Sequence, residues 1–134
     1  MSKARRAWVG LLLPVAIAAT GCGPVGGESD SEAAGDTVTE LIEARNRNDF
    51  ATVCDLISAQ QLAAFTRAGR SCAKTLRQVV GVDTTTTLRI EQVRVSGDRA
   101  TVDATVSQTG GAGRAQTILL VKEEGDWKVS QAGF

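Results

Sequence analysis

The chain has 134 residues, enough for one domain and little else, and its 15 basic and 15 acidic residues cancel to a net charge of zero. This balance gives no positive field that would recruit nucleic acid, so no nucleic-acid partner is expected. There is no histidine or tyrosine, which removes the commonest proton-transfer side chain, and three cysteines make a conventional zinc site unfavourable. We therefore expect neither a metal nor a cofactor.

Residues 1–21 have the pattern of an export signal. Three basic residues precede an uncharged apolar run at 7–19, which is shorter than the about 20 residues that a membrane-spanning helix needs. Pro14 lies inside this run and disfavours a permanent membrane helix. The pattern predicts a secretory signal peptide that is removed from the mature chain.

The sequence Ala19-Thr20-Gly21-Cys22 resembles the lipobox of bacterial lipoproteins, although Ala19 stands where a leucine is usual. The resemblance implies cleavage between Gly21 and Cys22 and attachment of a diacylglyceryl group to the Cys22 thiol. We then expect a protein anchored by lipid on the extracytoplasmic face of the cell membrane. The alternative is an ordinary signal peptide cut near Ala19, which would leave Cys22 free or disulfide-bonded.

Residues 23–36 consist mainly of glycine, serine, proline and acidic residues, with little to bury. This composition predicts a flexible tether over residues 22–36, including the lipidated Cys22, followed by one globular domain at 37–134. The alternative is a solvated arm of that domain.

Helical periodicity follows over residues 37–80 and predicts three or four short helices. Thr37 and Glu40 have the spacing of a capping box at the first helix, one face of which carries Val38, Leu41, Ile42 and Arg45. The later helices are expected to begin or end at cap residues, namely Asn48 or Asp49, Ser58 with Gln61, Gly69, Ser71 and Gly81.

From residue 88 the periodicity becomes two, which predicts antiparallel strands at 88–95, 100–107, 115–123 and 127–134. Gly97-Asp98 and Gly125-Asp126 are expected to form two-residue hairpin turns. The first strand does not keep one apolar face throughout. It therefore either contains a β-bulge near Glu91-Gln92, the interpretation we favour, or is buried on both sides.

Two cysteines remain once Cys22 is assigned to lipid. In an oxidising compartment this pair, Cys54 and Cys72, predicts a disulfide that closes a short loop between two helices. The alternative is a pair of buried, reduced cysteines.

Helices followed by a meander of strands resemble the nuclear transport factor 2-like (cystatin-like) superfamily, in particular its small secreted actinobacterial lipoproteins. The resemblance rests on LIEARNRNDFATVCDLIS, where one helix breaks into the next, on the two cysteines that follow Cys22, and on GDWKV at 125–129. It implies an α+β cone, in which N-terminal helices pack on a curved antiparallel sheet of about four strands and a cavity opens at one end.

Several relatives that this resemblance brings in are enzymes, such as ketosteroid isomerases and polyketide cyclases, which use an aspartate or histidine base in an apolar pocket. This chain could supply only carboxylates. We expect the cavity, if open, to involve Phe65, Asp103, Ile118 and Trp127. We expect a non-enzymatic role, in which the domain binds an envelope protein or a small apolar ligand, or supports envelope assembly. The alternative is an isomerase, cyclase or hydrolase that uses Asp103 or another carboxylate.

Overall fold

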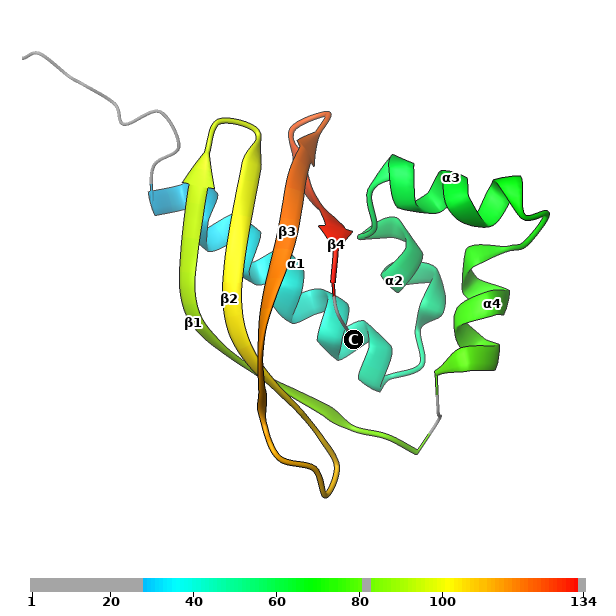
Figure 1. The fold of residues 1–134 in the computed structure, drawn as a ribbon. Helices are drawn as coiled ribbons and strands as arrows, with labels where there is room; N and C mark the ends of the chain where they lie inside the picture. The colour runs from blue at the N-terminus through cyan, green and yellow to red at the C-terminus, as the bar shows by residue number, and fades with distance from the viewer. Residues whose placement is uncertain (1–27, 81–82, 133–134) are drawn as a thin grey trace, which may run out of the picture.

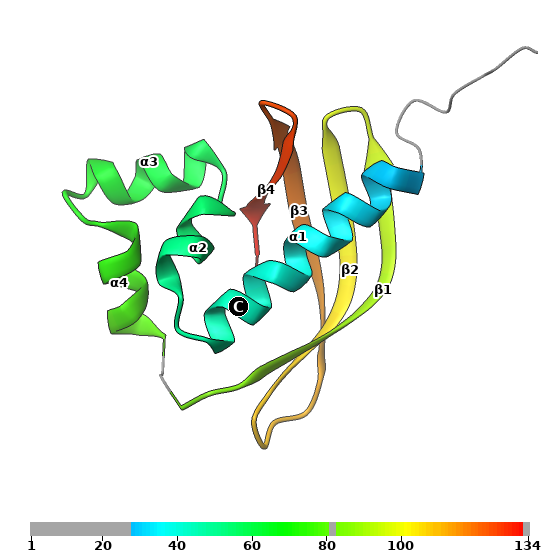
Figure 2. The same ribbon diagram turned by 180° about the vertical axis from the view of Figure 1, so that it is seen from behind.

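The computed structural model describes residues 28–80 and 83–132, so the predicted export signal, Gly21, Cys22 and the start of the predicted tether lie outside the described residues. Helices come first and strands follow. The helices are α1 (Glu28–Asn46), α2 (Phe50–Asp55), α3 (Ala59–Arg67) and α4 (Cys72–Val79), and the strands are β1 (Thr86–Ser96), β2 (Arg99–Gln108), β3 (Arg114–Glu123) and β4 (Asp126–Gln131). Figures 1 and 2 show α1 lying across one face of a curved sheet, with the three short helices grouped beside β4. The predicted α+β class is confirmed.

Helix α1 begins at Glu28 instead of at Thr37, so the predicted tether is wrong over residues 28–36. Thr37 lies within the helix and does not cap it, because its hydroxyl donates to the carbonyl of Ala33 one turn earlier. This segment is polar on average, so its sequence did not indicate a helix. The helix contacts the sheet through small residues.

The first half of α1 is attached to the sheet. Ala34 is fully buried, and Gly35 lies so close to β1 that an added Cβ would be 3.6 Å from Cδ1 of Ile90. Asp30 forms a 2.6 Å ion pair with Lys122 of β3, and both side chains are partly buried. Residues 28–36 therefore belong to the domain.

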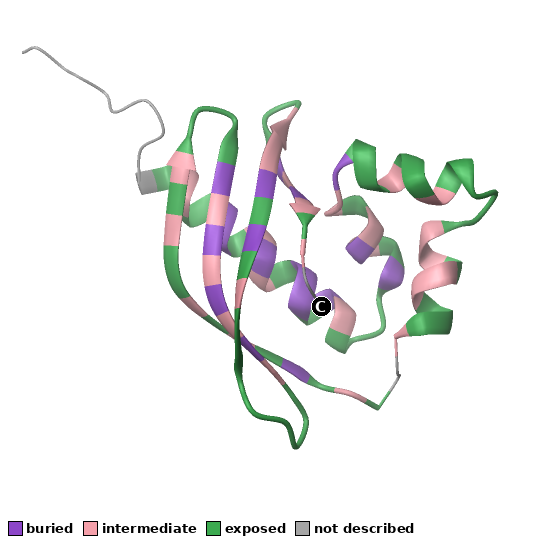
Figure 3. Ribbon diagram, viewed as in Figure 1, coloured by how far each residue is buried: buried purple, intermediate pink, exposed green. Residues whose placement is uncertain are grey.

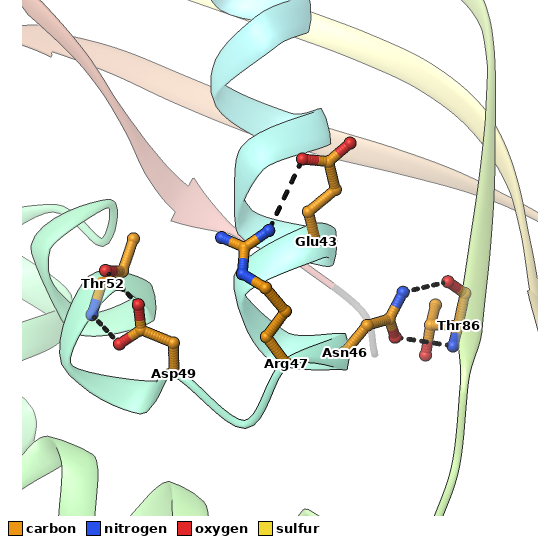
Figure 4. Close-up of polar contacts among 6 residues, drawn as sticks. All are labelled: Glu43, Asn46, Arg47, Asp49, Thr52 and Thr86. Atoms are coloured by element: carbon orange, nitrogen blue, oxygen red, sulfur yellow. Dashed lines mark hydrogen bonds and ion pairs between the residues drawn. The ribbon is translucent and has the colours of Figure 1, made fainter.

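Helix α1 breaks into α2 at Asn48 and Asp49, as predicted. Asn48 takes a positive φ of 59°, which asparagine tolerates, and the carboxylate of Asp49 caps α2 (Figure 4). Hydrogen bonds from the hydroxyl and the backbone N–H of Thr52 lower the pKa of Asp49, because they stabilise its charged form. The Asn46 amide donates to the Thr86 carbonyl at 2.7 Å and accepts from the Thr86 N–H at 2.8 Å, which joins α1 to β1.

The predicted start of α3 is confirmed. The Ser58 hydroxyl accepts from the backbone N–H of Gln61, and the helix ends just before Gly69, which has a positive φ of 66°. Helix α4 begins after Ser71, as predicted, although the Ser71 side chain makes no cap hydrogen bond. Gly81, the expected end of α4, lies outside the described residues.

The strands form a meander in the order β1-β2-β3-β4, with every neighbouring pair antiparallel. The register of β1 against β2 shifts between Ile90 and Gln92, which confirms the predicted bulge. Because the bulge changes the phase of the strand, its apolar residues before and after that point all pack against the core: Leu88, Ile90, Val93 and Val95.

One hairpin turn lies where it was predicted and the other does not. Gly97-Asp98 joins β1 to β2, with Gly97 at φ 61°. Between β3 and β4 the turn residues are Glu124 and Gly125, at φ 51° and 90°, so the predicted turn at Gly125-Asp126 is wrong by one residue. Positive φ at both central residues is what a tight hairpin of this kind requires.

The core lies between α1 and the concave face of the sheet, where buried positions alternate along β2 and β3 (Figure 3). Helices α3 and α4 contain no buried residue. The segment before α3 pairs with β4, because the N–H of Val129 donates to Leu56 and the N–H of Ser58 donates back to Val129. Within the described ranges no helix is both long and apolar enough to cross a membrane.

Candidate ligand pocket

A pocket of about 500 Å³ opens between the three short helices, the end of α1 and β4. Ten apolar residues form most of its wall: Leu41, Phe50, Val53, Ile57, Phe65, Leu76, Val79, Val80, Val129 and Ala132. The polar lining residues are Arg45, Gln61, Thr84, Gln108, Ser130 and Gln131. Its size and composition are those of a site for a small, mainly apolar molecule.

Each wall of the pocket comes from a short apolar stripe. Phe50 and Val53 lie on one face of α2 and are buried, whereas Phe65 of α3 and Leu76 of α4 are partly exposed. The strand wall is built by β4, where the Gln61 amide donates to the Ser130 carbonyl at 2.6 Å and attaches α3 to that edge. One side of the pocket is therefore part of the core, and the other consists of two thinly packed helices.

The predicted Cys54–Cys72 disulfide is present and joins α2 to α4. Helices α3 and α4, which form the outer wall of the pocket, have no buried residue, so core packing does little to fix them. The disulfide fixes this wall to the domain by a covalent bond. The disulfide thus holds the wall of the pocket against its floor.

Replacing both cysteines, as in Cys54→Ser with Cys72→Ser, is expected to lower the free energy of local opening of α3 and α4 by at most about 3 kcal/mol, because the loop between the two cysteines is no longer closed when these helices open. The loss of protection should concentrate in α3 and α4, and hydrogen exchange will measure it residue by residue. Amides of β2 and β3 serve as the internal control. An equal loss of protection in the sheet would contradict a local role for the disulfide.

Of the four residues predicted to form a cavity, Phe65 lines the pocket and the other three do not. Asp103 lies on the outer face of β2, where it pairs with Arg94 at 2.7 Å and accepts from the Thr117 hydroxyl at 2.8 Å. The alternation of buried and half-exposed positions along β2 directs this carboxylate away from the helices. The prediction that Asp103 belongs to the cavity is therefore wrong.

Ile118 and Trp127 are core residues, not pocket residues. Ile118 is fully buried on β3, and Trp127 of β4 is also buried, with the Lys122 ammonium 5.2 Å from its ring centroid. The indole N–H of Trp127 is buried and has no hydrogen-bond partner among the residues that the structure describes. Strand position alone could not distinguish a core residue from a pocket residue, because both face the concave side of the sheet.

Several lining residues were missed from the sequence. Leu76 and Val79 of α4 and its C-cap residue Val80 line the pocket, but the pocket forms only where this helix packs against α2. The sequence did single out Arg45, because this residue continues the apolar face of α1.

Arg45 is the one charged residue among the lining residues that the structure describes. Burial lowers the pKa of Arg45, since a partly desolvated charge is disfavoured. No aspartate or glutamate of the described ranges lines the pocket, and no group of acidic, cysteine or histidine side chains there could hold a metal ion. The pocket thus combines apolar walls, a few amides and hydroxyls, and one guanidinium.

The helices packed on a curved meander sheet, with a pocket at one end, form an α+β fold like that of nuclear transport factor 2-like proteins. The crystal structure of a nuclear transport factor 2-like protein of unknown function from Shewanella baltica is similar, with a TM-score of 0.56 and 14% identity over 78% of this chain and 90% of that one. A protein from Campylobacter jejuni described as a nuclear transport factor 2-like transpeptidase gives a TM-score of 0.49 and 16% identity, over 72% and 96% of the two chains. The sequence matches no protein-family model and no curated protein. The likeness therefore concerns the fold alone.

Proposed function

We propose that this chain is an extracytoplasmic lipoprotein whose domain binds a small, mainly apolar ligand without catalysing its conversion. A diacylglyceryl group on Cys22 holds it to the cell membrane. The export signal and the lipobox-like sequence before Cys22 support the location, as does the resemblance to secreted actinobacterial lipoproteins. The observation that carries the binding role is the pocket itself.

Two features of the pocket favour ligand binding over a structural role. Its volume of about 500 Å³ is within the range of small-molecule sites, and ten of its lining residues are apolar. The large core side chains Ile118 and Trp127 pack elsewhere and leave this space open. A domain that served only as a support would gain stability from filling such a space.

The alternative, an isomerase, cyclase or hydrolase that uses a carboxylate, receives less support. Such a mechanism needs a carboxylate within hydrogen-bond reach of the substrate. Asp103 lies on the opposite face of the sheet, and the described lining residues include no other carboxylate. We therefore favour binding without catalysis.

The binding role is tested by titration with the neutral fluorescent probe N-phenyl-1-naphthylamine, using the full-length chain with Cys22→Ser so that no lipid anchor contributes. Phe65→Asp places a charge in the apolar wall, which must then be desolvated when the probe binds. We expect a single saturable site in the parent chain and an affinity loss of about tenfold or more in Phe65→Asp.

Ala64→Asp is the matched control, because Ala64 is an exposed neighbour on α3 that does not line the pocket. It is expected to change the affinity by less than about twofold. Equal affinities for the parent chain and Phe65→Asp would mean that the probe binds elsewhere, for example on the apolar run at 7–19, and would overturn the proposed function.

A further inference from the structure

Arg45 occupies a position on α1 where the sequence pattern calls for an apolar residue. Leu41 and Val38 lie one and two turns earlier on the same helical face, and both are buried. Arg45 continues this face in the last turn, is partly buried and lines the pocket. The helix thus ends its apolar face with a positive charge at the wall of an apolar space.

The hydrogen bonds within the described residues leave most of this charge unmatched. One guanidinium nitrogen of Arg45 donates to the hydroxyl of Thr86, a buried residue of β1. A guanidinium has five N–H donors in a planar fork. The ion pairs of the described ranges join other residues, and none includes Arg45: Arg47–Glu43, Arg89–Glu91, Arg94–Asp103 and Lys122–Asp30.

Arg47, in contrast to Arg45, has an acidic partner on the same helix. Two residues further along, Arg47 pairs with Glu43 at 3.7 Å, and both side chains are well exposed (Figure 4). Arg45 instead lines the pocket, where the other described lining residues carry no charge. A guanidinium remains protonated even when burial lowers its pKa, so the pocket wall is cationic.

We infer that the ligand is an anionic amphiphile, whose apolar body fills the pocket and whose single oxyanion accepts hydrogen bonds from Arg45. This inference rests on the proposed binding function. The guanidinium fork matches the oxygens of a carboxylate or a phosphate, and it acts most strongly where water is partly excluded. Thr86 holds one edge of the fork, which leaves its other donors for the ligand.

Two probes that differ in one group separate this inference from the proposed function. N-phenyl-1-naphthylamine is neutral, and its 8-sulfonate, 1-anilinonaphthalene-8-sulfonate, carries one oxyanion on the same skeleton. Both are titrated into the full-length Cys22→Ser chain, with and without Arg45→Gln. Glutamine removes the charge and keeps one polar N–H donor group at the position of the arginine Nε.

We expect Arg45→Gln to weaken binding of the sulfonate probe by about tenfold and to change binding of the neutral probe by less than about twofold. Arg47→Gln is the matched control, because it removes an equal charge from the same helix end outside the pocket. Arg45→Met, of similar length, provides a second variant if Arg45→Gln folds poorly. Arg45→Lys should keep most of the preference for the anion.

If Arg45→Gln and Arg47→Gln weaken binding of the sulfonate probe equally, the effect comes from the net charge of the chain and not from the pocket. That result would overturn the inference. If the neutral probe fails to bind the parent chain, the proposed function fails first. A variant without residues 133 and 134 tests an occupant from the chain itself. If that variant binds the sulfonate probe more tightly, by about threefold or more, the removed segment competes for Arg45. This result would make that segment the partner of Arg45 and overturn the inference.

Competition then identifies the oxyanion. Dodecanoate, dodecyl phosphate and dodecanol share one chain length and are each used below the concentration at which they aggregate. We expect either anion to displace the neutral probe at about a tenfold lower concentration than dodecanol, and this advantage to disappear in Arg45→Gln. The better of the two anions names the head group. Dodecanol as effective as both anions would contradict a role for Arg45 in ligand recognition.

Discussion

Replacing Cys22 with serine is expected to abolish lipid attachment and to release the protein from the membrane fraction. Two acyl chains anchor stably, because each buried methylene contributes about 0.8 kcal/mol. The mature chain has little else to hold it: removal of residues 1–21 leaves 12 basic and 15 acidic residues, a net charge of −3. Such a chain is not attracted to anionic head groups.

The measurement combines membrane fractionation with the intact mass of the mature chain. In the unsubstituted protein, the first residue of the mature chain should be Cys22, carrying the added mass of a diacylglyceryl group. Gly23→Ser is the matched control, since it changes the next residue and leaves the thiol in place. An unmodified Cys22 in the unsubstituted protein would contradict the lipoprotein hypothesis. If Cys22→Ser stays fully in the membrane, residues 7–19 would be the anchor.

The sheet was predictable from the sequence because its signals are local. Alternation along β2 gave the buried face, and the phase change in β1 located the bulge at the position where the register shifts, near Glu91. A two-residue turn at Gly97 follows from a residue that accepts a positive φ at little cost. The disulfide followed from counting cysteines in a chain that its sequence predicts to be exported.

The start of α1 and the pocket could not be predicted in the same way. Residues 28–36 are polar on average, and the residues they bury, Ala34 and Gly35, are too small to register as an apolar stripe. The pocket depends on how α4 folds back over α2, which is a tertiary arrangement fixed partly by one disulfide. Asp103 was considered because its residue type suits catalysis, although the alternation along its strand indicates the face opposite the apolar one, where the structure has it.

Ala34→Asp is expected to unfold most of the domain, or to lower its free energy of unfolding by about 4 kcal/mol or more, because it buries an unpaired carboxylate. Ala34 is fully buried where α1 crosses the sheet. A loss of this size is comparable with the whole stability of a small domain, which is about 5–15 kcal/mol. Urea unfolding followed by far-ultraviolet circular dichroism, in the full-length Cys22→Ser chain, measures the change.

Ala33→Asp is the matched control, because Ala33 is the exposed neighbour in the same turn of α1. Both variants carry the same cost in helix propensity and the same added charge, so the difference between them reports burial alone. The exposed substitution should change the free energy of unfolding by about 1 kcal/mol or less. A flexible tether over residues 28–36 would make the two variants equally stable, and that result would return the start of the domain to residue 37.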